Sequence, residues 1–272
     1  MRLNKYVAHH STYSRREADK TIQLGYVKVN DVVEKNPAYD VKEGRDEVRL
    51  KGKLLSPNAM YTIIVYNKRK GELVTKTDPR GRKTIFDTLP HKFRHFTPVG
   101  RLDFASEGLL LLTDSSSVAT ALMQSDVERV YKIKIKGAIT PAMETAMREG
   151  IYLEDASKGA HSHSKIKAME FAPFSWYKIQ KNRADYSILK VAITEGKNRE
   201  LRRFFAHFDA EVVDLKRLAY GSIELDALPD GKSRYLDRKE YGDIKDFLKQ
   251  LKKKEKKDGK NQPEDSTQNG DD

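Results

Sequence analysis

Apolar residues recur along this chain with two spacings, and each spacing predicts a different element. In residues 3–7 they keep the three- and four-residue spacing of a short amphipathic helix. A second helix should begin at Ser14, because Ser14 followed three residues later by Glu17 is the pattern of a capping box. Gly25 is placed to end that helix. The N-terminal stretch therefore predicts two short helices in succession.

Alternation of apolar and polar residues, which is typical of half-buried strands, begins directly after the second helix. Residues 26–33 alternate around a turn-forming Asn-Asp pair, and a strand around 47–50 would complete a small sheet. Residues 53–60 contain Ser, Pro and Asn, so neither a helix nor a strand suits them. We expect residues 1–52 to form one small domain, followed by a polar linker.

Strands are predicted in six segments beyond the linker, of which 109–113 is a short apolar run typical of a buried strand. They are 61–66, 109–113, 129–135, 187–194, 212–218 and 222–225. Residues 151–185 give weaker strand signals, and we expect them to form hairpins of the same sheet.

Helices are predicted between these strands. Asp114 is placed to cap one over residues 115–124, another covers 141–149, and Asn198 is placed to cap a third. These mixed elements indicate an α+β fold.

The second domain should cover residues 61–238. Residues 239–272 predict a C-terminal helix that frays into a charged tail, because the last part contains almost no apolar residue.

Composition narrows the possible partners. The chain has 272 residues, a formal net charge of +12 and an isoelectric point near 9.5, which favours a polyanionic partner such as RNA. It has no cysteine, which excludes disulfides, thiolate metal sites and a cysteine nucleophile. No apolar run reaches the length of a membrane span, so we expect a cytoplasmic protein.

The loop before the strand at 109–113 is the main candidate for chemistry. It contains Arg101 and Asp103 between two glycines, Gly100 and Gly108, which allow a tight loop against a ligand. Such a loop at a sheet edge is a common place for a catalytic carboxylate. Taken alone, it could equally be an ordinary loop with a solvated aspartate.

Basic residues gather at two further places. One group shares an exposed face of the second helix, and the other lies at the start of the helix behind Asn198. The groups are Arg15, Arg16 and Lys20, and Arg199, Arg202 and Arg203. The second group would make an anion site, although a solvated basic face remains the alternative for both.

Residues 2–6, 14–18 and 25–30 resemble the small RNA-binding module, of the S4 type, that a ribosomal protein shares with several RNA-modifying enzymes. Further motifs are similar to those of ribosomal RNA pseudouridine synthases, and most of all to the large-subunit synthase B group. These motifs are 100–103 with 107–110, Tyr131, 195–203 and 215–217.

The resemblance implies a mixed, mainly antiparallel sheet with flanking helices and a central cleft. It also implies that Asp103 acts at the ribose of a uridine, that Tyr131 stacks on the extruded base, and that Arg202 pairs with the Asp103 carboxylate. Leu215 would pack beneath the base, and Arg101 would displace the nucleotide or hold phosphates. Further RNA contacts would come from Arg199, Arg203, Arg15, Arg16, Lys20 and Lys28. The implied substrate is ribosomal RNA. The sequence contains no metal-ligand cluster and no nucleotide-phosphate loop, so we expect no cofactor and no metal, and a monomer is the default expectation.

The chemistry agrees with a single carboxylate. The freed uracil is itself the incoming partner, whereas a glycoside hydrolase would need a second placed carboxyl group. A non-catalytic ribosome-assembly factor would share the charge and the N-terminal module. It would not need Asp103, Tyr131 and Arg202 together.

Overall fold

The computed structural model describes residues 1–11, 13–55, 61–161 and 164–258. They fall into two compact units, Met1–Tyr235 and the chain from Leu236 onward, and each is described by itself. Within the described residues, no helix combines the length and the apolar composition that crossing a membrane requires.

The first unit begins with the two helices that the sequence predicts, α1 (Leu3–His9) and α2 (Arg15–Gln23). The capping box of α2 is present, since the Ser14 hydroxyl accepts from the Glu17 amide and the Glu17 carboxylate accepts from the Ser14 amide. Both helices bury their apolar side against a small hydrophobic core that includes Val27.

A four-stranded sheet in the order β2-β1-β3-β4 follows. Its strands are β1 (Val27–Val29), β2 (Val32–Val33), β3 (Val48–Leu50) and β4 (Lys53–Leu54). The expectation of a linker without secondary structure is wrong for its first residues, because Lys51 and Gly52 turn through positive φ and return Lys53 to pair with Leu50. Residues 56–60 of the expected linker lie outside the described residues.

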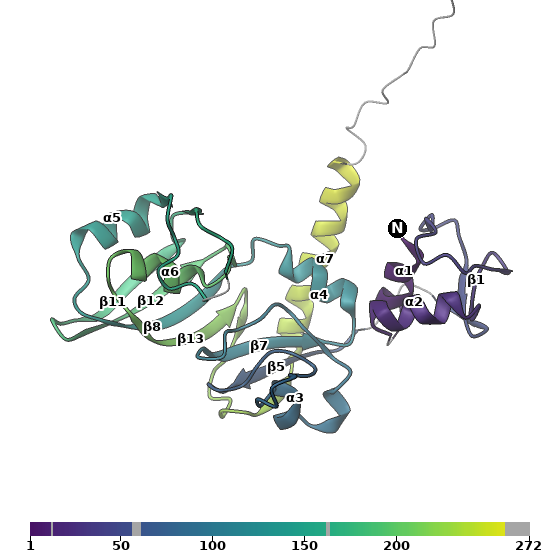
Figure 1. The fold of residues 1–272 in the computed structure, drawn as a ribbon, viewed down its shortest axis with the longest axis horizontal. Helices are drawn as coiled ribbons and strands as arrows, with labels where there is room; N and C mark the ends of the chain where they lie inside the picture. Colours follow the sequence, from purple (N-terminus) through teal and green to yellow (C-terminus); the bar gives the residue numbers. More distant parts are fainter. Residues whose placement is uncertain (12, 56–60, 162–163, 259–272) are drawn as a thin grey trace, which may run out of the picture. The chain divides into compact units, whose positions relative to one another are not determined.

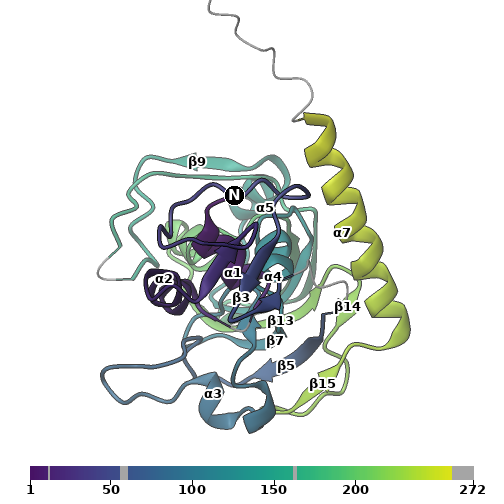
Figure 2. The ribbon, with the colours of Figure 1, turned by 90° about the vertical axis from the view of Figure 1, so that its right-hand side faces the viewer.

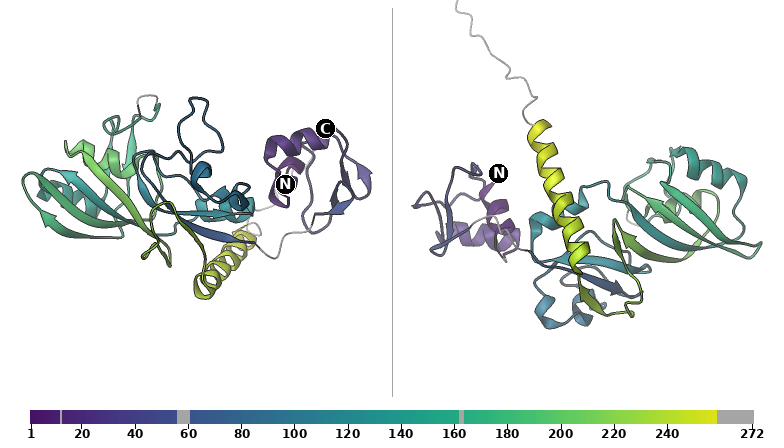
Figure 3. Two further views of the ribbon diagram at one scale, coloured as in Figure 1. Left: turned by 90° about the horizontal axis from the view of Figure 1, so that it is seen from below. Right: turned by 180° about the vertical axis from the view of Figure 1, so that it is seen from behind.

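The rest of this unit is organised on a nine-stranded sheet with the main order β11-β12-β8-β13-β7-β5-β15 (Figures 1 and 3). The main strands are β5 (Ile63–Lys68), β7 (Glu107–Thr113), β8 (Arg129–Lys136), β11 (Trp176–Asn182), β12 (Tyr186–Ile193), β13 (Val212–Tyr220) and β15 (Ser233–Tyr235). Two short strands join at its sides, β6 (Thr97–Pro98) on β7 and β14 (Ile223–Glu224) on β13. Every pair is antiparallel except β13–β7, which confirms a mixed, mainly antiparallel sheet.

Helices pack on this sheet and enclose its core. They are α3 (Ile85–Thr88), the 3₁₀ helix η1 (His91–Phe93), α4 (Ser116–Met123), α5 (Pro141–Glu149) and α6 (Glu200–His207). The core cluster joins apolar side chains of α5 and α6, such as Met147 and Phe204, to those of β8 and β12. This packing fixes α6 beside the strands that carry the site.

Two helix caps differ from the prediction by one residue. Ser115, not Asp114, caps α4, because the Asp114 carboxylate accepts from the amide of Thr62 instead. The cap of α6 is Arg199, which has a left-handed backbone at φ 51°, and the Asn198 side chain accepts from Arg203.

Residues 151–185 do not all join the main sheet. The strands β9 (Ile151–Leu153) and β10 (Met169–Phe171) form a separate two-stranded sheet, and only β11 extends the nine-stranded one (Figure 2). The expectation that residues 151–185 form hairpins of the main sheet is therefore right for β11 and wrong for β9 and β10.

In its described residues, 236–258, the second unit contains one helix, α7 (Arg238–Asp258). Asp237 and Glu240 cap it reciprocally, each side chain accepting from the other residue's amide. The charged tail expected after this helix, residues 259–272, lies outside the described residues.

Candidate active site

A pocket of about 160 Å³ opens where the loop before β7 meets β8, β13 and the start of α6. Its lining combines apolar side chains with several cations. The residues that the argument below uses are Asp103, Tyr131, Arg199, Arg202, Leu215 and Arg217.

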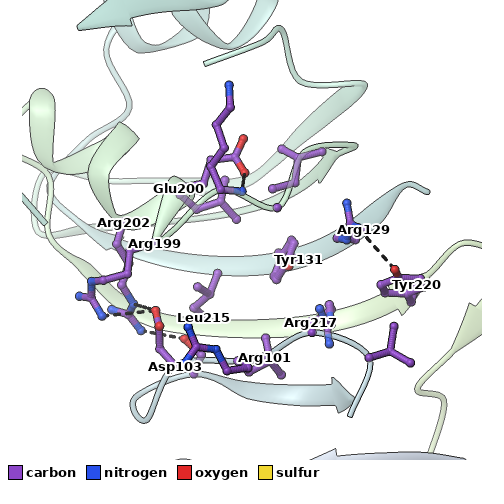
Figure 4. A pocket seen from close by; sticks show the side chains of 18 of the residues that line it. Arg101, Asp103, Arg129, Tyr131, Arg199, Glu200, Arg202, Leu215, Arg217 and Tyr220 are labelled. Atoms are coloured by element: carbon purple, nitrogen blue, oxygen red, sulfur yellow. Dashed lines mark hydrogen bonds and ion pairs between the residues drawn. The ribbon is translucent and has the colours of Figure 1, made fainter. Parts of the chain in front are cut away.

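The Asp103 carboxylate lies at one end of this pocket, beside two guanidinium groups from α6 and its cap (Figure 4). Arg199 Nη1 donates to Asp103 Oδ2 at 3.3 Å, and Arg202 Nε lies 3.7 Å from the same oxygen. Arg202 is therefore paired with Asp103 as an ion pair, while Arg199 makes the closer contact. Asp103 keeps about a third of its side chain exposed, so a ligand in the pocket can reach it.

Both arginines are held in place by backbone carbonyls. Arg199 Nε donates to Gly159 O at 2.7 Å, and Arg202 donates to Val212 O at 2.9 Å and to Ala105 O at 3.2 Å. Burial, with a smaller effect of the neighbouring Arg199 charge, lowers the pKa of Arg202, yet an arginine stays charged at neutral pH. The carboxylate therefore faces two cations whose positions are fixed.

A buried lysine that the sequence analysis did not select holds the Asp103 loop in place through hydrogen bonds. Lys68 is fully buried, and its ammonium donates to the carbonyls of Arg69, Asp103 and Ser106 at 2.9, 3.0 and 2.7 Å. Desolvation on burial lowers the pKa of Lys68 to about 8. Lys68 was missed because the predicted strand stops at Tyr66, whereas β5 continues for two more residues.

Gly108 is required for the approach of β13 to β7. It has a φ of 101°, and a Cβ there would collide with the backbone oxygen of Arg217 and lie 2.8 Å from its nitrogen. No residue with a side chain fits this contact without a shift of the backbone. The sequence predicted that Gly108 allows a tight loop against a ligand, whereas in the structure Gly108 lies within β7 and its close neighbour is the backbone of β13.

Tyr131 and Leu215 lie in the middle of the pocket, on neighbouring strands (Figure 4). Tyr131 is 8% exposed and Leu215 7% exposed, so only a small part of each side chain is open to the cavity. Arg101 is exposed in the loop that carries Asp103.

The other end of the pocket contains residues that the sequence analysis did not connect with it, namely Arg129, Arg217 and Tyr220. The guanidinium groups of Arg129 and Arg217 lie over the Tyr220 ring at 5.1 and 5.5 Å. Arg217 lies within the motif 215–217, but the resemblance gave it no role, and Arg129 had only its position in a predicted strand, which does not separate a pocket face from the core. Tyr220 lies between two predicted strands and had no signal.

Glu200, the first residue of α6, is a further buried group of the lining that sequence reasoning missed. Its Oε2 accepts from the Lys197 amide at 3.0 Å. Burial raises the pKa of Glu200 to about 7, against the opposing effect of that hydrogen bond.

Arg203 does not belong to this site, contrary to the expectation that it contacts RNA. It is fully buried and donates to the carbonyls of Asn198, Ala156 and Ile166 and to the side chains of Ser164 and Asn198. Arg203 follows Arg202 directly on α6, so its side chain is rotated by about 100° around the helix axis. That rotation directs it into the protein.

The basic residues of the N-terminal module are exposed. They are Arg15, Arg16 and Lys20 on α2, and Lys28 on β1. None of them lines the pocket described above.

In the part of the chain that the structure describes, no three His, Cys, Asp or Glu side chains are grouped as metal ligands.

Two family models match the chain. One is described as RNA pseudouridylate synthase and matches residues 62–207, and the other is the S4 domain and matches residues 1–47.

Relatives at the level of whole proteins agree. An uncharacterized RNA pseudouridine synthase of Helicobacter pylori is 52% identical over 250 residues, which cover 91% of this chain and 95% of that protein. The ribosomal large subunit pseudouridine synthase B of Bacillus subtilis is 31% identical over 237 residues, covering 86% of this chain and 91% of that protein.

One solved structure, a crystal structure of pseudouridylate synthase, matches with a TM-score of 0.60 at 24% sequence identity. The match covers 90% of this chain and 99% of that one. It supports the fold described above.

Proposed function

Because this chain belongs to the RNA pseudouridylate synthase family, we propose that it isomerises uridine in ribosomal RNA and that Asp103 acts on the ribose of the target nucleotide. The observation that carries the residue assignment is the Asp103 carboxylate, open to a pocket and held between two fixed guanidinium groups. The large ribosomal subunit is the proposed source of the RNA, since relatives such as that of Bacillus subtilis are named for it.

The reaction requires the target uridine to leave the RNA stack, which costs a few kcal/mol. Tyr131 and Leu215 contribute a ring and an apolar surface to the lining of the pocket, and Arg101 is an exposed residue of the same lining. We assign Tyr131 to stacking on the base, Leu215 to packing beneath it, and Arg101 to holding phosphates near the opening.

Asp103 then acts either as a nucleophile at the sugar or as a base that removes a sugar proton. The bond between uracil N1 and ribose C1′ breaks, the ring turns, and C5 bonds to C1′. The proton of C5 is lost and N1 gains one, so the product is an isomer of the substrate. Arg199 and Arg202 pair with the charge of Asp103 and keep its carboxylate aimed at the sugar.

Residues 1–52 would serve as an S4-like RNA-binding domain, 61–238 as the catalytic domain, and 239–272 as a C-terminal helix and tail. Exposed Arg15, Arg16, Lys20 and Lys28 supply phosphate contacts in this assignment. We propose that the protein works in the cytoplasm, because ribosomal RNA is its substrate. We further propose that it acts as a monomer without a cofactor.

The test is to map pseudouridines in both ribosomal RNAs from cells with the native protein, with Asp103→Asn, and with none. One site that loses its pseudouridine in the last two strains supports the reaction, the substrate and the residue together. A site lost without the protein but retained with Asp103→Asn would contradict the role of Asp103. If every site persists without the protein, a ribosome-assembly function replaces the proposed one.

A further inference from the structure

Two arginines of the described chain have a buried N–H group without a hydrogen-bond acceptor, and both line the pocket. The groups are Arg202 Nε and Arg217 Nη2. A buried donor without an acceptor is expensive, so such a group in a native protein needs an explanation. For Arg202 Nε the explanation is the Asp103 carboxylate, which lies 3.7 Å away. Among the residues that the structure describes, Arg217 Nη2 faces no such partner.

Arg217 is not free to turn toward another acceptor. It is 4% exposed, its Nε donates to Leu109 O at 2.6 Å, and its guanidinium lies over the Tyr220 ring. Its backbone is pressed against Gly108 of β7. The vacant Nη2 donor is therefore fixed in position before any ligand arrives.

The register of the sheet places this donor across the pocket from the reacting carboxylate. Arg217 lies opposite Tyr131, and Leu215 lies opposite Ile133, in the antiparallel pair of β13 and β8. Arg217 is one two-residue step beyond Leu215, or about 7 Å along the strand. Figure 4 shows Asp103 at one end of the pocket, Leu215 next, and Arg217 beside Tyr131 on the far side. A pyrimidine with its sugar at Asp103 and its face on Tyr131 would point its distant edge toward Arg217.

From this placement, and resting on the proposed function, we propose that Arg217 Nη2 donates a hydrogen bond to the uracil carbonyl that lies across the ring from the ribose. In uridine, C4 lies across the ring from N1, so the acceptor is O4. In pseudouridine, C2 lies across the ring from C5, so the acceptor is O2. One fixed donor therefore meets a carbonyl oxygen both before and after the ring turns, and it holds the detached ring between the two states.

The same contact selects uracil over cytosine. Cytosine carries an amino group at carbon 4, which is a donor and would face the Arg217 donor with no acceptor between them. A phosphate is a poorer fit for this position, because arginine binds phosphate best through two parallel donors. Nε of Arg217 is already used by Leu109 O and the side chain is almost fully enclosed, so the pair of Nε and Nη2 is not open to a phosphate.

The test combines changes in the enzyme with changes in the substrate. Native protein and Arg217→Met are assayed on a synthetic hairpin that carries the mapped target as uridine, 4-thiouridine or 2-thiouridine, since sulfur is the weaker acceptor. We expect each sulfur to lower kcat/KM about tenfold for the native protein and less than about twofold for Arg217→Met, as for the loss of one hydrogen bond. A purely structural role for Arg217 would leave the sulfur effects equal in the two proteins, and that result overturns the inference.

Arg203→Met is the matched control, because Arg203 is also buried but its nitrogens donate to protein acceptors. It should lose stability and keep the native sensitivity to sulfur. If Arg217→Met does not fold, Arg217→Lys replaces it, with a reduced sensitivity expected. Native protein without any sulfur effect overturns the inference by itself. Failure of native protein to convert the plain uridine hairpin would instead count against the proposed function.

Discussion

Positive charge is arranged in opposite ways in two regions of the Met1–Tyr235 unit. On α2 the side chains of Arg15, Arg16 and Lys20 are exposed. Around the pocket, Arg202 and Arg217 are at least nine-tenths buried and are tied to backbone carbonyls. Solvated cations attract a phosphate backbone from any direction, whereas buried ones meet only an atom that arrives at a defined point.

The difference separates affinity from chemistry. The exposed group costs little to maintain, and it can set how tightly a polyanion binds. Burying the cations of the second group costs desolvation free energy and leaves donors without acceptors. A ligand that supplies the missing acceptors offsets that cost. The two regions should therefore respond to substitution in different measured quantities.

The largest expected effect breaks the chemistry and leaves the affinity. Asp103→Asn keeps the size of the side chain but removes the charge that Arg199 and Arg202 face. We expect kcat to fall by roughly a thousandfold or more, as for loss of a central catalytic group. Binding of the same RNA, measured by filter retention, should change by less than about twofold. A residual rate within tenfold of native would remove Asp103 from the mechanism.

The next largest effect is on the free energy of unfolding, and it compares a glycine beside the pocket with one in the N-terminal module. Gly108→Ala places a methyl group against the backbone of Arg217 at a φ of 101°. We expect the free energy of unfolding to fall by about 3 kcal/mol, from overpacking and backbone strain together. Urea denaturation measures it.

Gly52→Ala is the matched control, because Gly52 has a φ of 81° but nothing within 4 Å of an added Cβ. It should cost only about 1 kcal/mol, the strain of the left-handed backbone. Equal losses in the two variants would mean that strain, and not the contact with β13, makes glycine necessary at 108.

The third effect uses pH to compare a buried carboxylate with an exposed one. The pKa of Glu200 is raised from 4.5 to about 7, so the folded protein holds a proton that the unfolded chain releases between those values. The stability that this group contributes is fully present below pH 4.5 and is lost as the pH rises through 7. Glu200→Gln does not titrate, and its stability relative to native should rise by about 3 kcal/mol from pH 4.5 to pH 8. A flat difference across urea titrations in this range would contradict the assignment.

Glu17 should show the opposite pH dependence of stability. Hydrogen bonds with the Ser14 hydroxyl and amide lower the pKa of its exposed carboxylate. Its contribution is present above its unfolded pKa and is lost as the pH falls through the lowered folded pKa, so Glu17→Gln should be destabilising at pH 7 and less so as the pH falls below 4.5. Profiles of the same sign for the two variants would contradict the comparison.

The smallest effect is on affinity alone. Replacing Arg15, Arg16 and Lys20 together by glutamine should weaken RNA binding about tenfold in 0.1 M salt and reduce the slope of log Kd against log salt. At saturating RNA the value of kcat should stay native, since these side chains do not line the pocket.

A second triple variant removes equal charge from other exposed positions of the same module. Those positions are Lys42, Arg45 and Lys53. It should weaken binding less than the α2 variant. Equal losses would mean that net charge, and not the α2 face, determines the affinity.

Much of the fold follows from local sequence patterns. The capping box at Ser14, the strict alternation in β8 and the apolar run of β7 all appear in the expected elements. The misses involve interactions between distant residues. Asp114 reads as a helix cap until the Thr62 amide, 52 residues away, takes its carboxylate.

The candidate site shows the same division. Its composition could be expected from a resemblance to known motifs, and Asp103, Arg199 and Arg202 do meet in space. Which way a basic side chain turns could not be expected, because Arg202 and Arg203 are adjacent and carry the same chemistry. Tertiary packing alone directs one to the pocket and the other to the interior.

The enclosure of Lys68 has a practical consequence for reagents that acylate lysines. Its ammonium has no exposed surface, so a reagent that modifies the many surface lysines cannot touch it while the carbonyls of Asp103 and Ser106 surround it. Burial is what lowers its pKa, so once uncovered it should react as an ordinary surface lysine does. The rate at which Lys68 becomes labelled would therefore count how often the Asp103 loop opens.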